Sequence, residues 1–372
     1  MSHGTFSNDS TVVASSENLD RPKILLMGLR RGGKSSICNV VFHNMQPLDT
    51  VFLESTSRPT SELIRSLVDF TVSEMPGQIN VLDDNYDKAR LFENVGSLVY
   101  VVDSQDEYLY TLSNLVDIIE AVYPEYPSIN FEILIHKVDG LSDDFKGDTA
   151  RDIRQRVTDD LLDLGLDGVK SFFHLTSIFN HSIFDAFSLI IQKLIPEVPT
   201  LRNMLDILCE HTGLEQAYLF DINSKLFVAS DNTSSSGVGG ASMEHFADFI
   251  DISVDLDNLY FESSSTSVTS SSETNADQNN NNTLLNGNKA AGPSALTTQS
   301  NSTSKKGLSP SHPRPLKCVS KLANGTTLYL YQMIRGLAIV ALTRKEGPHR
   351  MALVDYNLEK FRLGLERVWP VA

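Results

Sequence analysis

The chain has 372 residues with an ordinary hydrophobic fraction of 41%, a length that predicts about two domains, each able to bury a core. Its formal net charge of −16 argues against a nucleic-acid-binding protein, which would normally present a basic face. Three scattered cysteines indicate a reducing compartment and exclude a disulfide framework, and the lack of any apolar run of about 18 residues predicts a soluble protein with no direct membrane insertion.

Residues 1–20 are polar and rich in Ser, Thr and Asn, which predicts a disordered tail. From residue 21 to residue 199, apolar runs alternate with longer amphipathic stretches. The expected strands are residues 24–27, 67–72, 97–102, 131–135 and 172–175, and the expected helices include residues 108–122 and 149–164. This alternation predicts an α/β domain with a mainly parallel sheet and flanking helices, ending near Pro196 and Pro199.

The first expected strand leads into a glycine-rich loop. It reads Gly28-Leu29-Arg30-Arg31-Gly32-Gly33-Lys34-Ser35, matches the pattern G-x-x-x-x-G-K-[ST], and is followed by a helix-forming stretch from Ser36. Glycines let successive backbone N–H groups point inward at phosphate oxygens, and a helix N-terminus adds partial positive charge. We therefore expect residues 30–36 to bind nucleotide phosphates, with Lys34 also stabilising transition-state charge and Ser35 coordinating Mg²⁺.

Two further segments are expected to sense a γ-phosphate. In residues 51–60, Thr56 is the first choice and Thr60 the second for a hydroxyl that ligates Mg²⁺ only when the γ-phosphate is present. The segment Glu74-Met75-Pro76-Gly77-Gln78 stands where GTPases carry D-x-x-G and a following Gln. We expect Glu74 to hold Mg²⁺ through water, the Gly77 N–H to reach the γ-phosphate, and Gln78 to orient the attacking water.

The choice of base rests on His136-Lys137-Val138-Asp139, which follows the strand at residues 131–135. Guanine offers two hydrogen-bond donors, N1–H and the exocyclic amine, to a carboxylate such as that of Asp139. Adenine has neither donor at those positions. The GTPase pattern is [NT]-K-x-D, so His136 departs from it. After the next strand, Thr176-Ser177-Ile178 occupies the place of a loop whose backbone N–H groups contact the guanine oxygen.

A second pattern begins near residue 200. We expect a helix at 201–211, a hairpin of strands 217–221 and 226–229 around Asn223-Ser224, and a helix at 244–256. Residues 263–313 are dominated by Ser, Thr and Asn and are expected to form a disordered insertion in a domain that spans 200–372. Strand patterns resume at 317–321, 327–333 and 337–343. A last helix carries one apolar stripe, best explained by packing on the domain's own sheet: Val354, Leu358, Phe361, Leu365 and Val368.

Taken in order, these motifs resemble the Rag GTPases, specifically the RagC/RagD class and its fungal equivalents. The resemblance lies in residues 23–31 and 33–36, in Phe52-Leu53-Glu54-Ser55-Thr56, in Pro76-Gly77-Gln78 and in residues 135–144, and it is strong over about 21–231. His136 is itself typical of that class. The resemblance implies a Ras-like P-loop G domain followed by a roadblock-like α/β/α domain, with GTP or GDP and Mg²⁺ bound in the first.

The resemblance also implies partners. Family members pair with a RagA/RagB-type GTPase through the C-terminal domain. A lipidated, membrane-anchored scaffold complex holds the dimer on the vacuolar or lysosomal surface. The nucleotide state then relays amino-acid availability to the target-of-rapamycin kinase complex 1.

The favoured interpretation is a nucleotide-dependent switch that hydrolyses GTP slowly by itself and needs a GTPase-activating protein, because no internal arginine finger can be chosen between Arg30 and Arg31. Glu74 and His136 motivate an alternative, a pseudo-GTPase that holds nucleotide as a structural part of a dimer. A small-molecule kinase is a third possibility, and the Lys137-x-Asp139 pair speaks against it.

Overall fold

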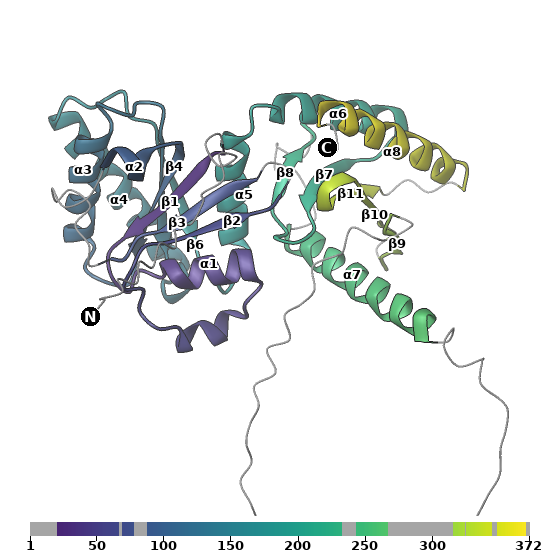
Figure 1. The fold of residues 1–372 in the computed structure, drawn as a ribbon, viewed down its shortest axis with the longest axis horizontal. Helices are drawn as coiled ribbons and strands as arrows, with labels where there is room; N and C mark the ends of the chain where they lie inside the picture. The colour runs from purple at the N-terminus through teal and green to yellow at the C-terminus, as the bar shows by residue number, and fades with distance from the viewer. Residues whose placement is uncertain are drawn as a thin grey trace, which may run out of the picture.

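The computed structural model describes residues 21–66, 69–77, 88–232, 243–266, 315–323, 325–343 and 348–369. They form a six-stranded sheet in the order β2-β3-β1-β4-β5-β6 and a five-stranded sheet in the order β8-β7-β11-β10-β9 (Figure 1). The predicted tail at 1–20, the insertion beyond residue 266 and Gln78 lie outside the described residues.

The first sheet is mainly parallel, as predicted. Its strands are β1 (Lys23–Gly28), β2 (Thr60–Ile64), β3 (Phe70–Glu74), β4 (Val95–Asp103), β5 (Asn130–His136) and β6 (Ser171–Thr176). All neighbouring pairs are parallel except β2 with β3. The intervening helical elements are α1 (Lys34–His43), η2 (Pro47–Phe52), α2 (Lys88–Phe92), α3 (Leu109–Val122), η3 (Val138–Gly140), α4 (Asp143–Asp163) and α5 (Ser182–Leu194).

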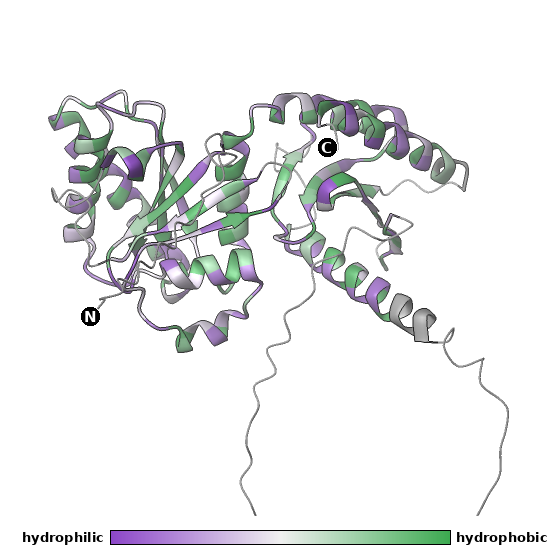
Figure 2. Ribbon diagram, in the orientation of Figure 1, coloured by the Kyte–Doolittle hydropathy of each residue, from purple (hydrophilic) through white to green (hydrophobic). Residues whose placement is uncertain are grey.

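Both faces of this sheet are buried, which explains why its strands read as continuous apolar runs. In β1, Ile24 and Leu26 pack with α1 and α5, whereas Leu25 and Met27 pack with α3 and α4. The hydropathy colouring in Figure 2 shows strands with long hydrophobic stretches beside helices that mix hydrophobic and hydrophilic residues.

Several elements differ from the sequence prediction; helix α4, for example, begins at Asp143, six residues before the helix expected at 149–164. The strand expected at 67–72 is β3, which ends at Glu74, so the carboxylate stands at the strand's own end. The edge strand β2 was not predicted, because its residues Thr-Ser-Glu-Leu-Ile are almost entirely exposed and show no apolar pattern. Its pairing with β3 alone defines it, and such an edge is fixed by tertiary contact rather than by propensity.

The second sheet is antiparallel throughout its described strands. Its elements are α6 (Val198–Thr212), β7 (Gln216–Asp221), β8 (Phe227–Ser230), α7 (Met243–Thr266), β9 (Lys317–Lys321), β10 (Thr327–Gln332), η5 (Ile334–Gly336), β11 (Leu337–Thr343) and α8 (Pro348–Val368). Helices α6 and α8 cover one face and α7 covers the other (Figure 1). Helix α7 runs through Thr266, so the start of the segment predicted to be disordered from residue 263 is helical.

The apolar stripe of α8 is buried within the molecule. Val354, Leu358, Phe361 and Leu365 join α6 and the sheet in one hydrophobic cluster, and Val368 is half-buried. Packing on the protein's own sheet, the explanation favoured from the sequence, therefore accounts for this stripe. None of the described helices is both long and apolar enough to cross a membrane.

The two sheets are joined by a continuous core. The cluster that contains β1, α1 and α5 also contains α6, β7, β8, β11 and α8. Pro199, expected near a domain end, lies in the first turn of α6, where a missing N–H costs nothing.

Candidate nucleotide-binding site

The predicted site residues gather at one edge of the six-stranded sheet. Gly28, Glu74, His136 and Thr176 are the last residues of β1, β3, β5 and β6, and Asp103 is the last residue of β4. Because parallel strands bring their carboxyl ends to the same edge, these five positions lie together, where open α/β sheets bind ligands.

The loop between β1 and α1 needs glycine at two positions. Gly28 has a φ of 136° and an added Cβ would lie 2.5 Å from the carbonyl oxygen of Val101. Gly33 has a φ of 103°, and its Cβ would lie 2.8 Å from the ring of His136. The chain therefore turns tightly into α1, whose N-terminus begins at Lys34.

Lys34 lies at the base of this loop. Its ammonium donates to the carbonyls of Gly28 and Leu29, both at 2.9 Å. Burial lowers the pKa of Lys34, and the Glu74 carboxylate opposes that shift. The lysine is thus held as a fixed point charge among backbone groups of the loop.

Three oxygen-bearing side chains meet beside Lys34. The Ser35 hydroxyl lies 2.8 Å from the Thr56 hydroxyl and donates to Glu74 Oε1 at 2.5 Å. Thr56 donates to the same carboxylate oxygen at 3.0 Å. Two hydroxyls and a carboxylate are hard oxygen donors, a set that fits Mg²⁺. In the part of the chain that the structure describes, no cluster of three His, Cys, Asp or Glu side chains is placed to hold a metal ion.

The structure places the two threonines considered as Mg²⁺ ligands, Thr56 and Thr60, in different surroundings. Thr56 is in contact with Ser35 and Glu74, whereas Thr60 opens β2 and pairs with Glu74 only through the sheet ladder. Gly77 lies against the loop backbone, because a Cβ there would come within 2.3 Å of the Arg30 nitrogen. The D-x-x-G-like turn therefore lies directly on the phosphate loop.

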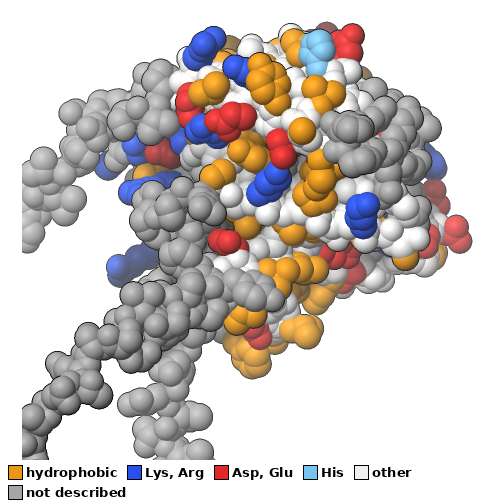
Figure 3. All heavy atoms as spheres, turned by 90° about the vertical axis from the view of Figure 1, so that its right-hand side faces the viewer, with side chains coloured by type: hydrophobic (Ala, Val, Ile, Leu, Met, Phe, Trp, Pro, Cys, Tyr) orange, Lys and Arg blue, Asp and Glu red, His pale blue; other side chains and the backbone are white. Residues whose placement is uncertain are grey.

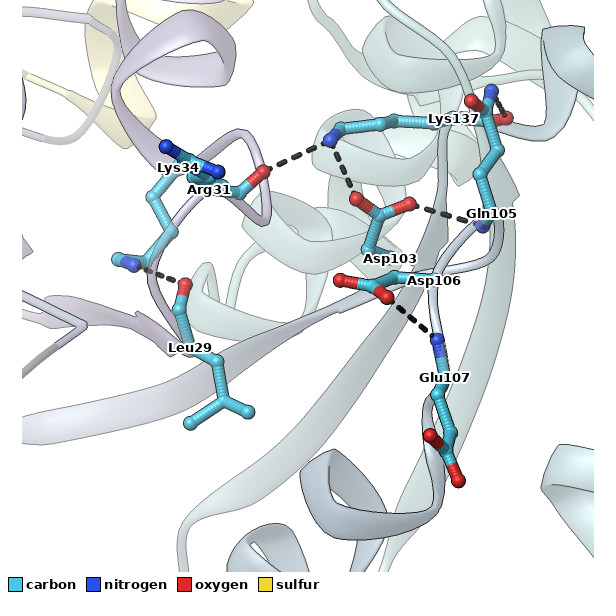
Figure 4. Close-up of polar contacts among 8 residues, drawn as sticks. All are labelled: Leu29, Arg31, Lys34, Asp103, Gln105, Asp106, Glu107 and Lys137. Carbon is cyan, nitrogen blue, oxygen red and sulfur yellow. Dashed lines mark hydrogen bonds and ion pairs between the residues drawn. The ribbon is translucent and has the colours of Figure 1, made fainter.

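Lys137 connects the base-side turn to the phosphate loop. Its ammonium donates to the Arg31 carbonyl at 2.9 Å and to Asp103 Oδ2 at 2.5 Å, as Figure 4 shows. Gln105 donates from Nε2 to the Lys137 carbonyl at 2.7 Å. Asp103 and Gln105 were not predicted from the sequence, because no motif marks them; the only signal is their position directly after a strand.

His136 is buried beneath the loop. Its Nδ1 lies 3.0 Å from the Thr176 hydroxyl, and its ring contacts the position of Gly33. Burial, followed by the nearby Lys137, lowers the pKa of His136 to about 4, so the imidazole is neutral near pH 7. The structure therefore places His136 between the phosphate loop and the Thr176 loop, as a support for both.

Asp139 is exposed and accepts a 2.5 Å hydrogen bond from the Ser177 hydroxyl. The Ser177 N–H, one of the amides of the loop expected at the guanine oxygen, donates to the Ser182 hydroxyl at 2.9 Å. Ile178 lies half-buried against the core and lines a separate cavity of about 330 Å³. The structure thus brings Asp139 and Ser177 together, with the Ser177 amide engaged inside its own loop.

A cavity of about 460 Å³ opens over the phosphate loop. Most of the predicted phosphate-side and metal-side residues line it: Arg30, Arg31, Gly33, Lys34, Ser35, Ser36, Thr56, Glu74 and Gly77. Of the predicted base-side residues, Lys137 lines it as well. Gly32 does not line it, and its N–H donates to the Leu29 carbonyl within the loop.

This architecture defines a class of protein. A mainly parallel sheet with a phosphate loop after its first strand and a Lys-x-Asp turn after its fifth strand is a Ras-like G domain, here followed by a C-terminal α/β domain. The site combines a glycine-rich loop, a cluster of hydroxyl and carboxylate oxygens from Ser35, Thr56 and Glu74, and the Asp139 carboxylate after β5.

Comparison with known proteins gives the family. Residues 23–250 match the model of the Gtr1/RagA G protein conserved region, so the chain belongs to the Gtr1/RagA family of G proteins. It is 49% identical over 352 residues to the GTP-binding protein GTR2 of Saccharomyces cerevisiae, covering 94% of this chain and 93% of the relative. Identity is 42% to gtr2 of Schizosaccharomyces pombe, over 93% and 98% of the two chains, and 40% to the human Ras-related GTP-binding protein C, over 94% and 77%. Within the family, the chain is therefore of the GTR2/RagC/RagD class.

Proposed function

We propose that this protein is a guanine-nucleotide switch that binds GTP with Mg²⁺, hydrolyses it, and changes the order of its loops as a result. The observation that carries the proposal is the meeting of Ser35, Thr56 and Glu74 beside Lys34. These residues come from three separate segments of the chain. Their hydroxyl and carboxylate oxygens lie close enough together to hold a cation next to bound phosphates.

Mg²⁺ would be held by the hydroxyls of Ser35 and Thr56, with Glu74 as its counter-charge. The ion supplies charge neutralisation of the β- and γ-phosphates. Because Thr56 and Gly77 lie on loops that meet the site, contacts with a γ-phosphate would order both loops, and hydrolysis would release them.

Hydrolysis is expected to be slow without help. Lys34 and the loop amides stabilise charge in the transition state, and Gln78 is our candidate for orienting water. Arg30 and Arg31 are both exposed in the loop, and the carbonyl of Arg31 is bonded to Lys137. We therefore infer that fast turnover needs a GTPase-activating protein.

The partner surface is proposed on the C-terminal domain. Relatives named gtr1 and GTR1 belong to the same family, and a protein of that RagA/RagB type is the proposed partner. Helix α7 exposes Ile252, Leu256 and Leu259 at helical spacing, and β9 is an edge strand of the second sheet. Figure 3 shows hydrophobic side chains among charged ones at this end of the molecule.

The proposed cellular role is the one that the resemblance to the Rag class implies. We propose that a membrane-anchored scaffold complex holds the heterodimer on the vacuolar or lysosomal surface, where its nucleotide state relays amino-acid supply to the target-of-rapamycin kinase complex 1. Imaging of the tagged protein tests this proposal. Vacuolar signal that persists after deletion of the scaffold would contradict it.

Nucleotide competition tests the switch itself. The wild-type chain should bind GTP and GDP at least a hundredfold more tightly than ATP, since a carboxylate facing adenine loses both of its hydrogen bonds. The Lys34→Ala variant should lose GTP binding and hydrolysis while its circular dichroism spectrum stays unchanged. Equal uptake of ATP and GTP by the wild type would refute the proposal.

A non-cycling pseudo-GTPase is the second candidate. Glu74, one methylene longer than the usual aspartate, bonds both hydroxyls directly. If that geometry persists with nucleotide bound, Mg²⁺ is poorly held and turnover stops. Single-turnover hydrolysis with and without an activating protein separates the two, because only a cycling enzyme is accelerated.

A further inference from the structure

The three residues after the core of β4, Asp103-Ser104-Gln105, hold Lys137 at both of its ends. Asp103 Oδ2 accepts from the ammonium at 2.5 Å, and Gln105 Nε2 donates to the carbonyl at 2.7 Å (Figure 4). Between them, the Ser104 N–H donates to the His136 carbonyl at 3.0 Å. One short loop therefore holds the Lys137 ammonium, the Lys137 carbonyl and the carbonyl of the preceding residue, His136.

These contacts stabilise an unfavourable backbone conformation at Lys137. Lys137 has a φ of 62°, in the left-handed region that non-glycine residues rarely adopt. Such a conformation persists only when surrounding contacts determine it. The ammonium also reaches the Arg31 carbonyl at 2.9 Å, so the strained residue joins three loops.

Gln105 also bears on the turn that carries Asp139. A Cβ at Gly140 would lie 2.2 Å from Gln105 Nε2, so the amide packs directly on the backbone of that turn. Asp103 is itself held, because its Oδ1 accepts the Gln105 N–H at 3.0 Å. Gln105 is thus linked to the direction in which Asp139 points, and Asp103 to the position of the phosphate loop.

We propose that Asp103 and Gln105 are positioning residues for nucleotide recognition, with separate effects. Gln105 orients the turn that presents the Asp139 carboxylate to guanine. Asp103 ties Lys137 to the phosphate loop and acts on any bound nucleotide alike. The proposal rests on the proposed function, in that it takes Asp139 as the group that recognises the base.

Hypoxanthine distinguishes the two effects. It keeps the N1–H of guanine but lacks the exocyclic amine, so a well-placed carboxylate prefers GDP to inosine diphosphate through one hydrogen bond. Loss of Gln105 should reduce that preference, whereas loss of Asp103 should weaken both nucleotides without changing their ratio.

The first measurement compares the affinities of the full-length chain for GDP and inosine diphosphate by fluorescence competition. Gln105→Met keeps the length and apolar stem but removes the donor, and Gln105→Ala removes both. We expect the ratio of the two affinities to fall about three- to tenfold in each variant, the size of one hydrogen bond. Asp106→Ala is the matched control: Asp106 lies on the same loop and bonds the Glu107 N–H, and the ratio should stay at the wild-type value.

The second measurement addresses Asp103. Asp103→Asn keeps an acceptor for the Lys137 ammonium and should retain affinity within about threefold of wild type, whereas Asp103→Ala should weaken GDP and inosine diphosphate equally, by about tenfold. Rescue by asparagine and not by alanine marks a geometric role rather than a need for the charge.

Three results would overturn the positioning role. The first is a ratio of GDP to inosine diphosphate affinity that is unchanged in Gln105→Met. The second is a ratio that changes in Asp106→Ala as much as it does in the Gln105 variants. The third is a Gln105 variant that loses the preference for GDP over inosine diphosphate and also unfolds at a lower temperature than Asp106→Ala. Failure of the proposed function looks different, because the wild-type chain itself would then bind GDP no better than ADP.

Discussion

At the scale of single residues, the site depends on a few side chains whose contacts no local pattern fixes. Glu74 illustrates this. The sequence predicted a carboxylate near a metal, and the structure adds that its Oε1 accepts from both Ser35 and Thr56. One charged oxygen thus organises two hydroxyl groups from different segments.

Replacing that charge gives a prediction. In Glu74→Gln, the Mg²⁺ concentration needed to slow GDP release should rise about tenfold, because a neutral amide cannot balance the ion. Release measured in chelator should change little, since no ion is then held. Glu62→Gln, the same change at an exposed position of β2, is the control. An unaltered Mg²⁺ requirement in Glu74→Gln would exclude the carboxylate from the metal site.

His136 gives a second residue-scale prediction, on pH. The pKa of this buried imidazole falls from 6.5 to about 4, so between those values the unfolded chain binds a proton that the folded chain does not. Stability is therefore lost as pH falls below 6.5, by about 2 kcal/mol at pH 5. Urea unfolding at pH 7 and pH 5 should show that this loss is smaller in His136→Asn, which removes the titrating group. Equal losses in the two proteins would contradict the assignment.

At the scale of elements, helix α5 links the two sheets. It begins after the Thr176–Ile178 loop, and two of its side chains bond the backbone of the edge strand β8: Ser188 accepts the Phe227 N–H at 3.0 Å, and Gln192 donates to the Phe227 carbonyl at 3.2 Å. Arg202 of α6 in turn donates to Gln192. The edge of the second sheet is therefore closed by a helix of the first domain, which protects it from pairing with other chains.

Removing these contacts tests the link. The double variant Ser188→Ala, Gln192→Ala should lower the free energy of unfolding by about 2–4 kcal/mol, because two partly buried backbone groups of Phe227 lose their partners. Amide exchange in β8 should become faster. Ser113→Ala, at an exposed helical serine, should change stability by less than about 0.5 kcal/mol. A double variant as stable as Ser113→Ala would show that the hydrogen bonds between α5 and β8 do not stabilise the fold.

At the scale of the whole molecule, the continuous core predicts shared stability. The hydrophobic cluster runs from β1 and α1 through α5 to α6, β11 and α8. A ligand bound at the phosphate loop should therefore stabilise both sheets, although it touches one.

Calorimetry can check this coupling. A single unfolding transition is expected, and GDP with Mg²⁺ at about a hundred times its dissociation constant should stabilise the whole chain by about 2.7 kcal/mol. Amides of α6 and β7 should exchange more slowly as well. Two transitions, with only the first moved by nucleotide, would contradict the shared core.

The sequence by itself determined the class of the fold and the position of the glycine-rich loop after its first strand. Apolar runs marked the buried strands, and the spacing from Gly28 to Ser35 defined the loop, because both depend on residues close together in the chain. Only the tertiary structure brought Thr56 into contact with Ser35 and Glu74, placed His136 under Gly33, and brought Asp103 and Gln105 to Lys137. Those outcomes depend on which strand ends become neighbours, and β2, with its exposed and patternless residues, exists only because β3 pairs with it. Contacts between distant segments are set by packing of the whole chain, which local periodicity does not encode.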